Sequence, residues 1–193
     1  MLYLILGPSG VGKSVQVKKL RENHPDFVFP KSVSTRKMRP GESQGNPYFF
    51  ISDEEFDQHI AAEDFLEYAV VHESARYGTL KQPIQEAVEQ DKVVIKELDI
   101  QGLKKVWETI AAGKADFLEG KLASIFLLPP SEEVLINRIV SRSEIKEREL
   151  NQRLESARRE VEQAHLCTHQ VKVEDEDSIE EVYEKVGKII VPR

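Results

Sequence analysis

The sequence predicts an α/β protein in which a doubly wound parallel sheet carries an inserted lobe. Two observations favour this class. Short apolar runs alternate with amphipathic helical segments, and the first apolar run leads straight into a glycine-rich segment and a helix. With 193 residues, the chain is long enough for one such core with small subdomains and too short for two ordinary domains.

The formal net charge of −7 disfavours sequence-independent binding to nucleic acid or to an anionic membrane, although a local basic cluster could hold a small anion. Cys167 is the only cysteine, so no intrachain disulfide can form and nothing indicates an oxidising compartment. The first apolar run ends at Leu6, and no segment approaches about eighteen apolar residues. We therefore expect a cytoplasmic protein without signal peptide or membrane span, whose partners are small molecules.

A phosphate-binding loop is the clearest motif. It follows the apolar run Leu2–Leu6 and fits G-x-x-x-x-G-K-[ST] with Gly7, Pro8, Ser9, Gly10, Val11, Gly12, Lys13 and Ser14. Backbone N–H groups and the start of the next helix can wrap a phosphate, Lys13 can reach its β- and γ-oxygens, and the Ser14 hydroxyl can ligate Mg²⁺. A chance glycine-rich turn is the alternative, but the strand before the loop and the helix after it argue against that.

A basic segment follows at residues 31–42, in a protein that is otherwise acidic. The helix after the phosphate loop is expected to end before Pro25, and a short extended piece is expected at 27–29. Arg36 and Arg39 are three residues apart beside hydroxyl groups, so two guanidinium groups can converge on one dianionic phosphate. A solvated loop is the alternative interpretation of this charge.

The lobe is expected to contain a strand at 48–51, a helix opened by a capping box at 52–55, a strand at 65–72, and a turn at 76–79 leading into a helix near Pro83. His72 stands alone among apolar neighbours. We interpret it as a structural, partly buried histidine rather than a catalytic one.

The run 92–99 predicts an apolar strand that finishes in acid, as in strands whose terminal carboxylate meets Mg²⁺ beside a phosphate loop. Asp99 is the favoured metal group, and Glu97 lies two residues earlier. Alternatively, Asp99 caps the helix that follows.

The remaining elements are a helix at 103–110, a polar connector at 113–121 without an interpretation, a buried strand at 123–128, a helix capped by Ser131, a strand at 170–173 and a helix opened by Ser178. Residues 138–159 are dense in arginine and glutamate. Pairing along an exposed helix face explains this charge, and so does a mobile lid that closes arginines over ATP.

Several separate segments carry a resemblance that covers nearly the whole chain: GPSGVGKS at 7–14, SVS…R..RPGE at 32–42, FLEYA at 65–69, YGT at 77–79, LDIQG at 98–102 and SIFLLPPS at 124–131. In these segments the chain resembles the guanylate kinase family. The resemblance implies a P-loop NTPase type of fold. Its parts would be a core over 1–31, 81–137 and 160–193, an inserted lobe over 32–80 that binds the nucleoside monophosphate, and a helical lid over 138–159.

The resemblance also implies the binding residues for GMP. Those for its phosphate are Arg36, Arg39, Tyr48 and Tyr77, and those near the base are Ser34, Glu67 and Thr79. Glu97 and Asp99 complete the expected GMP set. Glu67 would face the Watson–Crick edge of guanine. Guanine offers donors at N1 and N2 to a carboxylate, whereas adenine has a lone pair at N1 and no amine at C2.

Arginines around the transferred phosphoryl group are implied as well. Arg138, Arg142 and Arg153 match family arginines of the lid and its neighbouring helix. Together with Lys13 and Arg36 they form the expected catalytic set, and Ser14 and Asp99 form the expected metal set.

The sequence departs from the usual family pattern at four places. The segment SVSTR at 32–36 is two residues shorter than SVSxTTR, and Glu97 stands where Asp is usual. The lid's usual GRG reads Ser-Arg-Ser at 141–143, and a V-N-D-D stretch near the adenine site reads Val-Glu-Asp-Glu at 173–176. We expect substrate preference and turnover to differ from a typical member for these reasons.

The expected activity is ATP-dependent phosphorylation of GMP, and of dGMP, by direct in-line transfer with ATP and Mg²⁺, in a monomer or homodimer. Two alternatives are a guanylate-kinase-like module that binds phosphorylated peptides, and a kinase for another monophosphate such as IMP. Intact Lys13 and Ser14 argue against the module.

Overall fold

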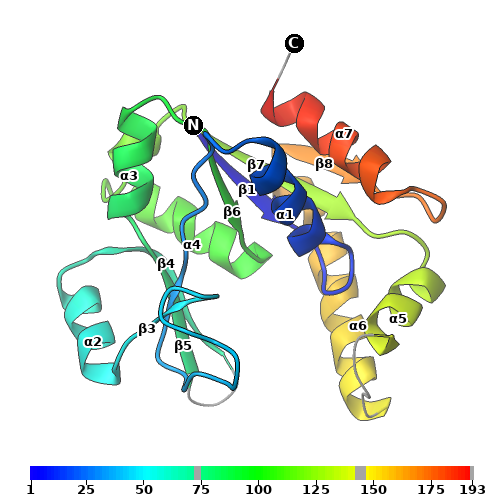
Figure 1. Ribbon diagram of the computed structural model, residues 1–193, viewed down its shortest axis with the longest axis horizontal. Helices are drawn as coiled ribbons and strands as arrows, with labels where there is room; N and C mark the ends of the chain where they lie inside the picture. Colours follow the sequence, from blue (N-terminus) through cyan, green and yellow to red (C-terminus); the bar gives the residue numbers. More distant parts are fainter. Residues whose placement is uncertain (72–74, 142–146, 192–193) are drawn as a thin grey trace. The chain divides into compact units, whose positions relative to one another are not determined.

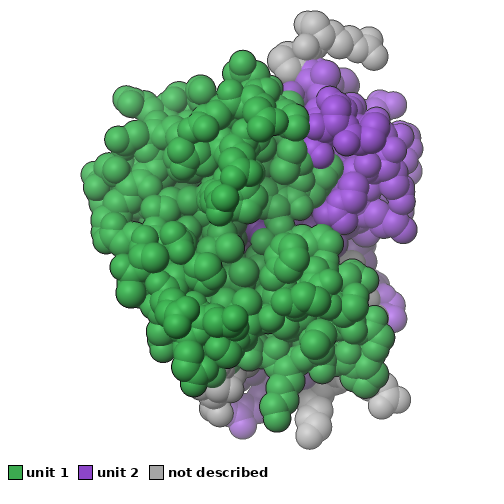
Figure 2. All heavy atoms as spheres, turned by 60° about the vertical axis from the view of Figure 1, so that its left-hand side comes forward, with its two compact units in different colours: residues 1–2, 28–94, 101–122 green, residues 3–27, 95–100, 123–193 purple. Residues whose placement is uncertain are grey.

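The computed structural model describes residues 1–71, 75–141 and 147–191 (Figure 1). Figure 2 colours two compact units: unit 1 is residues 1–2, 28–94 and 101–122, and unit 2 is residues 3–27, 95–100 and 123–193. His72, Arg142 and Ser143 lie outside the described residues. Within the described ranges, no helix is both long enough and apolar enough to cross a membrane.

Unit 2 contains most of a parallel sheet with the strand order β6-β1-β7-β8. Its strands are β1 (Leu2–Leu6), β6 (Val94–Glu97), β7 (Leu122–Leu128) and β8 (His169–Lys172). Every residue of β1 is buried, which explains why its sequence is a continuous apolar run. Because β6 and β7 lie on opposite sides of β1, the direction of strand addition reverses there. Ligands bind at such switch points, outside the carboxyl ends of the strands.

Helices of unit 2 pack in two pairs; they are α1 (Lys13–Asn23), α5 (Glu132–Val140), α6 (Glu147–Glu162) and α7 (Ile179–Ile190). Helix α1 lies beside α7, where the Gln16 amide donates to the Ile179 carbonyl at 3.2 Å (Figure 1). Helices α5 and α6 share an apolar cluster made of Leu135, Ile139, Leu154 and Ala157. The predicted end of the first helix before Pro25 is confirmed.

Unit 1 contains a second sheet with the order β3-β2-β5-β4. Its strands are β2 (Val33–Ser34), β3 (Phe49–Phe50), β4 (Phe65–Val71) and β5 (Ala75–Leu80). Strand β5 is antiparallel to both β4 and β2. Its helices are α2 (Asp53–Ala61), α3 (Gln82–Glu89) and most of α4 (Ile100–Ala111). Helix α2 covers the sheet through a core of Val33, Phe56 and Phe65.

The turn predicted at 76–79 is wrong, because these residues belong to strand β5. The glycine in YGT suggested a turn, but Gly78 serves the packing of the sheet. A Cβ atom at Gly78 would lie 2.4 Å from Cε1 of the Phe65 ring, so only glycine leaves room for that ring. The helix near Pro83 is present as α3 and begins after β5 ends.

Helix starts follow the predicted capping residues, with one correction. Ser52 and Ser178 each form a complete capping box, with Glu55 and Glu181 respectively. Ser131 occupies the N-cap position of α5, but its hydroxyl does not cap the helix. It donates to Asp175 instead, because that carboxylate lies 2.8 Å from the hydroxyl.

Three short segments also differ from the expected elements. Strand β6 ends at Glu97, so Asp99 lies beyond it and directly before α4. The extended piece expected at 27–29 is reduced to one parallel bridge between Val28 and Val94. The connector at 113–121 carries a short 3₁₀ helix, Asp116–Leu118, which buries Leu118.

Candidate functional site

The phosphate loop joins β1 to α1 and depends on glycines at its two ends. Gly7 has φ +137°, and a Cβ there would lie 2.6 Å from the Leu127 carbonyl oxygen. Gly12 is the N-cap of α1 with φ 110°, a left-handed conformation that other residues adopt only with strain. The loop therefore curves around the N-terminus of α1, where the first backbone N–H groups of the helix can bind a phosphate.

Lys13 lies over the loop rather than away from it. Its ammonium group donates to the carbonyl of Gly7 and, at 3.2 Å, to the carbonyl of Pro8. Arg138 on α5 approaches the same loop, with Nη1 3.5 Å from the Val11 carbonyl oxygen. Two of the predicted cations thus gather at the loop within unit 2.

The carboxylate next to the loop is Glu97. The Ser14 hydroxyl donates to its Oε2 at 2.9 Å. The sequence analysis assigned Glu97 to the residues that bind GMP and favoured Asp99 as the metal ligand. In the structure, however, Glu97 is the carboxylate hydrogen-bonded to Ser14. A hydroxyl and a carboxylate are hard oxygen donors of the kind Mg²⁺ takes, so this pair fits the ion that the loop motif implies.

Glu160 is a residue that sequence reasoning missed. It lies on α6, half-buried, with Ser156 Oγ 3.4 Å from its Oε1. Burial raises the pKa of Glu160 to about 7, while the charge on Lys13 lowers it and that on Asp99 raises it. In the sequence this residue is one glutamate within a charged run, and no local signal separates it from its neighbours.

The lid arginines have different surroundings. Arg153 on α6 pairs with Glu149 one turn earlier at 2.7 Å, and its side chain is 41% exposed. This pair is the solvated helix-face pairing that the sequence offered as the alternative to a lid. Arg142 lies outside the described residues.

Buried polar groups gather on one face of the unit 1 sheet. Glu67 on β4 is directly opposite Thr79 on β5, and the Thr79 hydroxyl donates to Glu67 Oε1 at 2.5 Å. Glu67 is 8% exposed and Thr79 fully buried. Ser34 on β2, also fully buried, is opposite Tyr77, two residues before Thr79 on the same face of β5. The fold thus brings together four of the predicted site residues, Ser34, Glu67, Tyr77 and Thr79.

Arg36 is held in a fixed orientation in the same unit. Its Nη1 and Nη2 donate to the two oxygens of Glu42, both at 2.7 Å, and Glu42 also accepts from the Arg39 backbone N–H at 2.8 Å. Arg36 first, and then this backbone N–H, hold the pKa of Glu42 down at about 2. The guanidinium lies 5.2 Å from the centroid of the Tyr48 ring. The sequence had assigned Glu42 no role.

Tyr77 completes this group. Its ring centroid is 5.4 Å from that of Tyr48. The Glu42 carboxylate and, more weakly, the Tyr77 hydroxyl raise the pKa of Arg36 above its usual value. Residue Arg39 is exposed, and Glu42 holds its backbone, since the Arg39 N–H donates to the Glu42 carboxylate and the Arg39 carbonyl accepts the Glu42 N–H at 3.1 Å. The predicted phosphate ligands Arg36, Tyr48 and Tyr77 therefore meet in unit 1.

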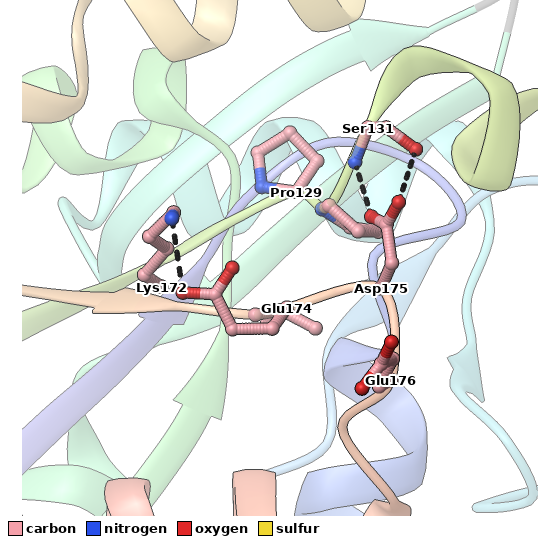
Figure 3. Close-up of a pocket in the computed structure, with 8 residues that line it drawn as sticks. Pro129, Ser131, Lys172, Glu174, Asp175 and Glu176 are labelled. Carbon is pink, nitrogen blue, oxygen red and sulfur yellow. Dashed lines mark hydrogen bonds and ion pairs between the residues drawn. The ribbon is translucent and has the colours of Figure 1, made fainter.

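A pocket of about 570 Å³ opens at the carboxyl ends of β7 and β8 in unit 2 (Figure 3). Asp175 forms one of its walls by accepting from the Ser131 backbone N–H at 2.7 Å and from the Ser131 hydroxyl. Lys172 and Glu174 form an ion pair at 2.9 Å on the other wall. The pocket is therefore lined by the 173–176 stretch in which the sequence departs from the usual pattern.

Comparisons with known proteins agree with one another. A family model described as guanylate kinase matches residues 1–192. The guanylate kinase of Clostridium tetani is 40% identical over 190 residues, which is 98% of this chain and 85% of that protein. The guanylate kinase of Corynebacterium diphtheriae is 37% identical over 193 residues, covering 100% of this chain and 95% of that protein.

A third relative, the guanylate kinase of Leifsonia xyli, is 39% identical over 170 residues; the match spans 88% of this chain and 63% of that protein, less than two thirds of its length. Among solved structures, a guanylate kinase from Anaplasma phagocytophilum superposes with a TM-score of 0.70 at 25% identity, covering 98% of this chain and 83% of that one. On the family match and these relatives, the chain belongs to the guanylate kinase family.

Proposed function

We propose that the protein transfers the γ-phosphoryl group of ATP to GMP, and to dGMP, giving ADP and the diphosphate by direct in-line displacement. The observation that carries this proposal is the buried pair of Glu67 and Thr79. Thr79 fixes one carboxylate oxygen, so Glu67 presents an oriented acceptor to a base. Guanine offers N1–H and the N2 amine to such an acceptor, and adenine offers neither.

The phosphate of GMP is proposed to bind Arg36, Arg39, Tyr48 and Tyr77. The Glu42 carboxylate and the Lys37 backbone carbonyl accept hydrogen bonds from the Arg36 guanidinium. A guanidinium has five N–H donors, so Arg36 keeps others for a phosphate while Glu42 fixes its plane. Ser34 supports the arginine, because its hydroxyl oxygen accepts the Arg36 backbone N–H at 3.3 Å.

ATP is proposed to bind unit 2, with its phosphates in the loop from Gly7 to Ser14 and its base in the pocket beside Asp175. Ser14 and Glu97, with Asp99 nearby in sequence, would hold Mg²⁺. When bound, the ion neutralises charge on the phosphate oxygens. Lys13 can turn from the loop carbonyls to the β- and γ-oxygens.

No covalent enzyme intermediate is needed for the transfer. In-line displacement requires the two nucleotides to be positioned and the charge on the moving phosphoryl group to be neutralised. Lys13 and Arg138 lie at the loop, and Arg142 and Arg153 complete the proposed set of cations. We propose that the protein acts in the cytoplasm, as a monomer or homodimer, without nucleic acid or membrane partners.

A coupled assay of ADP release tests this function. The protein would be supplied with ATP, Mg²⁺ and one monophosphate at a time: GMP, dGMP, IMP, AMP or CMP. We expect the fastest ADP release with GMP and dGMP, slower release with IMP and the slowest with AMP and CMP. Release with IMP alone would assign the second alternative, a kinase for another monophosphate. The absence of release with every base would reject the enzyme and favour the phosphopeptide-binding module, which titration with phosphopeptides would then examine.

A further inference from the structure

The segment that carries Arg36 and Arg39 begins at one anchored residue. We call residues 35–42 the phosphate arm; it leaves the sheet directly after β2. Its first residue, Thr35, donates its backbone N–H to the Arg76 carbonyl at 3.0 Å, and its hydroxyl oxygen accepts the Arg76 backbone N–H at 3.2 Å. Arg76 on β5 is therefore the point to which the base of the phosphate arm is attached.

The side chain of Arg76 binds helix α2. Its Nε and Nη2 donate to Asp53 Oδ1 at 3.1 and 2.7 Å, and Nη2 also donates to the Asp53 carbonyl at 2.7 Å. Its Nη1 donates to Asp57 Oδ1 at 2.5 Å, one turn further along α2. The guanidinium carbon lies 4.6 Å from the centroid of the buried Phe56 ring. Most of the donors of Arg76 are thus in use, which leaves it unsuited to bind a phosphate itself.

Arg76 closes this network through both its backbone and its side chain. Its guanidinium holds the pKa of the Asp53 carboxyl below the usual value. One strand residue, Arg76, therefore contacts helix α2 through its side chain and the base of the phosphate arm through its backbone. Helix α2 is itself fixed at its start by the capping box of Ser52.

We propose that Arg76 is a positioning residue for the acceptor phosphate, acting through Asp53 and Asp57 on α2. The inference rests on the proposed function. We call Thr35, Asp53, Asp57 and Arg76 the Arg76 cluster. Arg36 directly follows Thr35, and Tyr77 directly follows Arg76, so this cluster fixes the backbone from which both phosphate ligands start. Glu42 fixes the plane of the Arg36 guanidinium from within the arm, and this external attachment fixes the position of the arm's base on the sheet.

The ion pairs of Arg76 add little to global stability. The side chains of Asp53 and Asp57 are 64% and 67% exposed, so solvent screens both pairs, although the Arg76 side chain itself is 17% exposed. Loss of these ion pairs is therefore expected to change GMP binding more than unfolding. This difference separates a positioning role from a purely structural one.

The test replaces Arg76 and measures the two nucleotides separately. Arg76→Lys keeps the charge but cannot bind both aspartates at once, and Arg76→Gln removes the charge. Calorimetric titration should show GMP affinity falling about tenfold in Arg76→Gln and less in Arg76→Lys, with ATP affinity within about twofold of wild type. In turnover, KM for GMP should rise by the same factor while kcat changes less.

Three further variants make the test specific. Arg158→Gln removes an arginine–carboxylate pair, Arg158 to Glu132 at 2.6 Å, from unit 2, and it should leave GMP affinity unchanged. Thr35→Val keeps the shape but removes the hydroxyl that accepts the Arg76 backbone N–H, and it should weaken GMP about threefold. If Arg76→Gln does not fold, Asp57→Asn interrupts one exposed contact and should still weaken GMP.

The outcomes are distinct. Equal GMP affinity in wild type and all cluster variants would overturn the inference and leave the proposed function intact. Equal losses for GMP and ATP would also overturn it, because that result assigns Arg76 a general structural role. A wild-type protein that binds no GMP would overturn the proposed function and this inference together.

Discussion

The proposed donor half-site in unit 2 is centred on one uninterrupted stretch, residues 7–14, whereas the proposed acceptor half-site in unit 1 draws on β2, β4, β5 and the phosphate arm. The main cation of each half-site is also held by different groups. Lys13 is held by carbonyls of its own loop. Arg36 is held by the carboxylate of Glu42 and by the rings of Tyr48 and Phe50. The difference shows that backbone geometry builds the first site, and side chains from separate strands build the second.

The largest expected effect comes from the donor half-site. Lys13→Met removes the cation that stabilises charge at the β- and γ-phosphates, so kcat should fall by about 10³-fold or more. GMP should still bind in unit 1. Lys18→Met is the control, since Lys18 is 76% exposed on the same helix and pairs only loosely with Glu22 at 3.8 Å. Steady-state turnover and GMP titration measure both, and retained turnover in Lys13→Met would show that the loop is not catalytic.

The next effect tests base reading in the acceptor half-site. Glu67→Gln turns one acceptor oxygen into a donor that faces the donors of guanine, at a site where Glu67 is 8% exposed. The kcat/KM for GMP should fall by about 2–4 kcal/mol, roughly 30- to 1,000-fold. Glu63→Gln, a surface carboxylate paired with Lys114, is the control. An unchanged kcat/KM would move base reading to another residue.

The third prediction asks whether the two half-sites are independent. Arg36→Ala removes charge-assisted bonds to the acceptor phosphate and should weaken GMP about 10- to 100-fold, with ATP affinity unchanged. Arg39→Ala should act in the same direction. Lys37→Ala removes an exposed charge from the same arm and should have little effect. Calorimetry with each nucleotide distinguishes these cases, and equal losses for both nucleotides would mean that the arm is structural.

The smallest expected effect concerns pH. The pKa of Glu160 is raised to about 7 in the folded protein, above the value of an unfolded glutamate. The folded state therefore binds more protons between about pH 4.5 and 7, and stability falls as pH rises through this window. Glu160→Gln should be more stable than wild type at pH 8, by about 1–3 kcal/mol, and the gain should vanish at pH 4.5.

Urea unfolding at both pH values measures this change. Glu155→Gln is the control, because Glu155 lies on the same helix and its side chain is 63% exposed. A gain for Glu160→Gln that is equal at both pH values would show that the glutamate does not titrate between them.

Local signals were sufficient for much of the fold. The phosphate loop, the capping boxes at Ser52 and Ser178, and the apolar strands each depend on residues close together in sequence. Strand β5 was mistaken for a turn because Gly78 resembles a turn residue. Its real role depends on Phe65, a residue of another strand. Such tertiary packing leaves no local trace.

The site shows the same limit. Glu67 and Thr79 were identified through family motifs, which carry tertiary information that spacing alone does not, whereas Arg36 was already indicated by its spacing from Arg39. Glu42 and Glu160 were missed, because their roles come from partners that only the fold brings near. Glu97 was assigned to the GMP set, and its hydrogen bond to Ser14 could not be seen without the pairing of β6 beside β1.

The central claim is that unit 2 binds ATP, the phosphoryl donor, and that unit 1 selects the guanine nucleotide that accepts the phosphoryl group. One measurement tests this claim most directly. The protein would be given ATP labelled at the γ-phosphate, Mg²⁺ and an equimolar mixture of GMP, IMP and AMP, and the labelled diphosphates would be separated. Because IMP lacks the N2 amine and AMP also lacks N1–H, we expect the label mainly in GDP, less in IDP and least in ADP formed from AMP. Label spread equally over the three diphosphates would contradict the account.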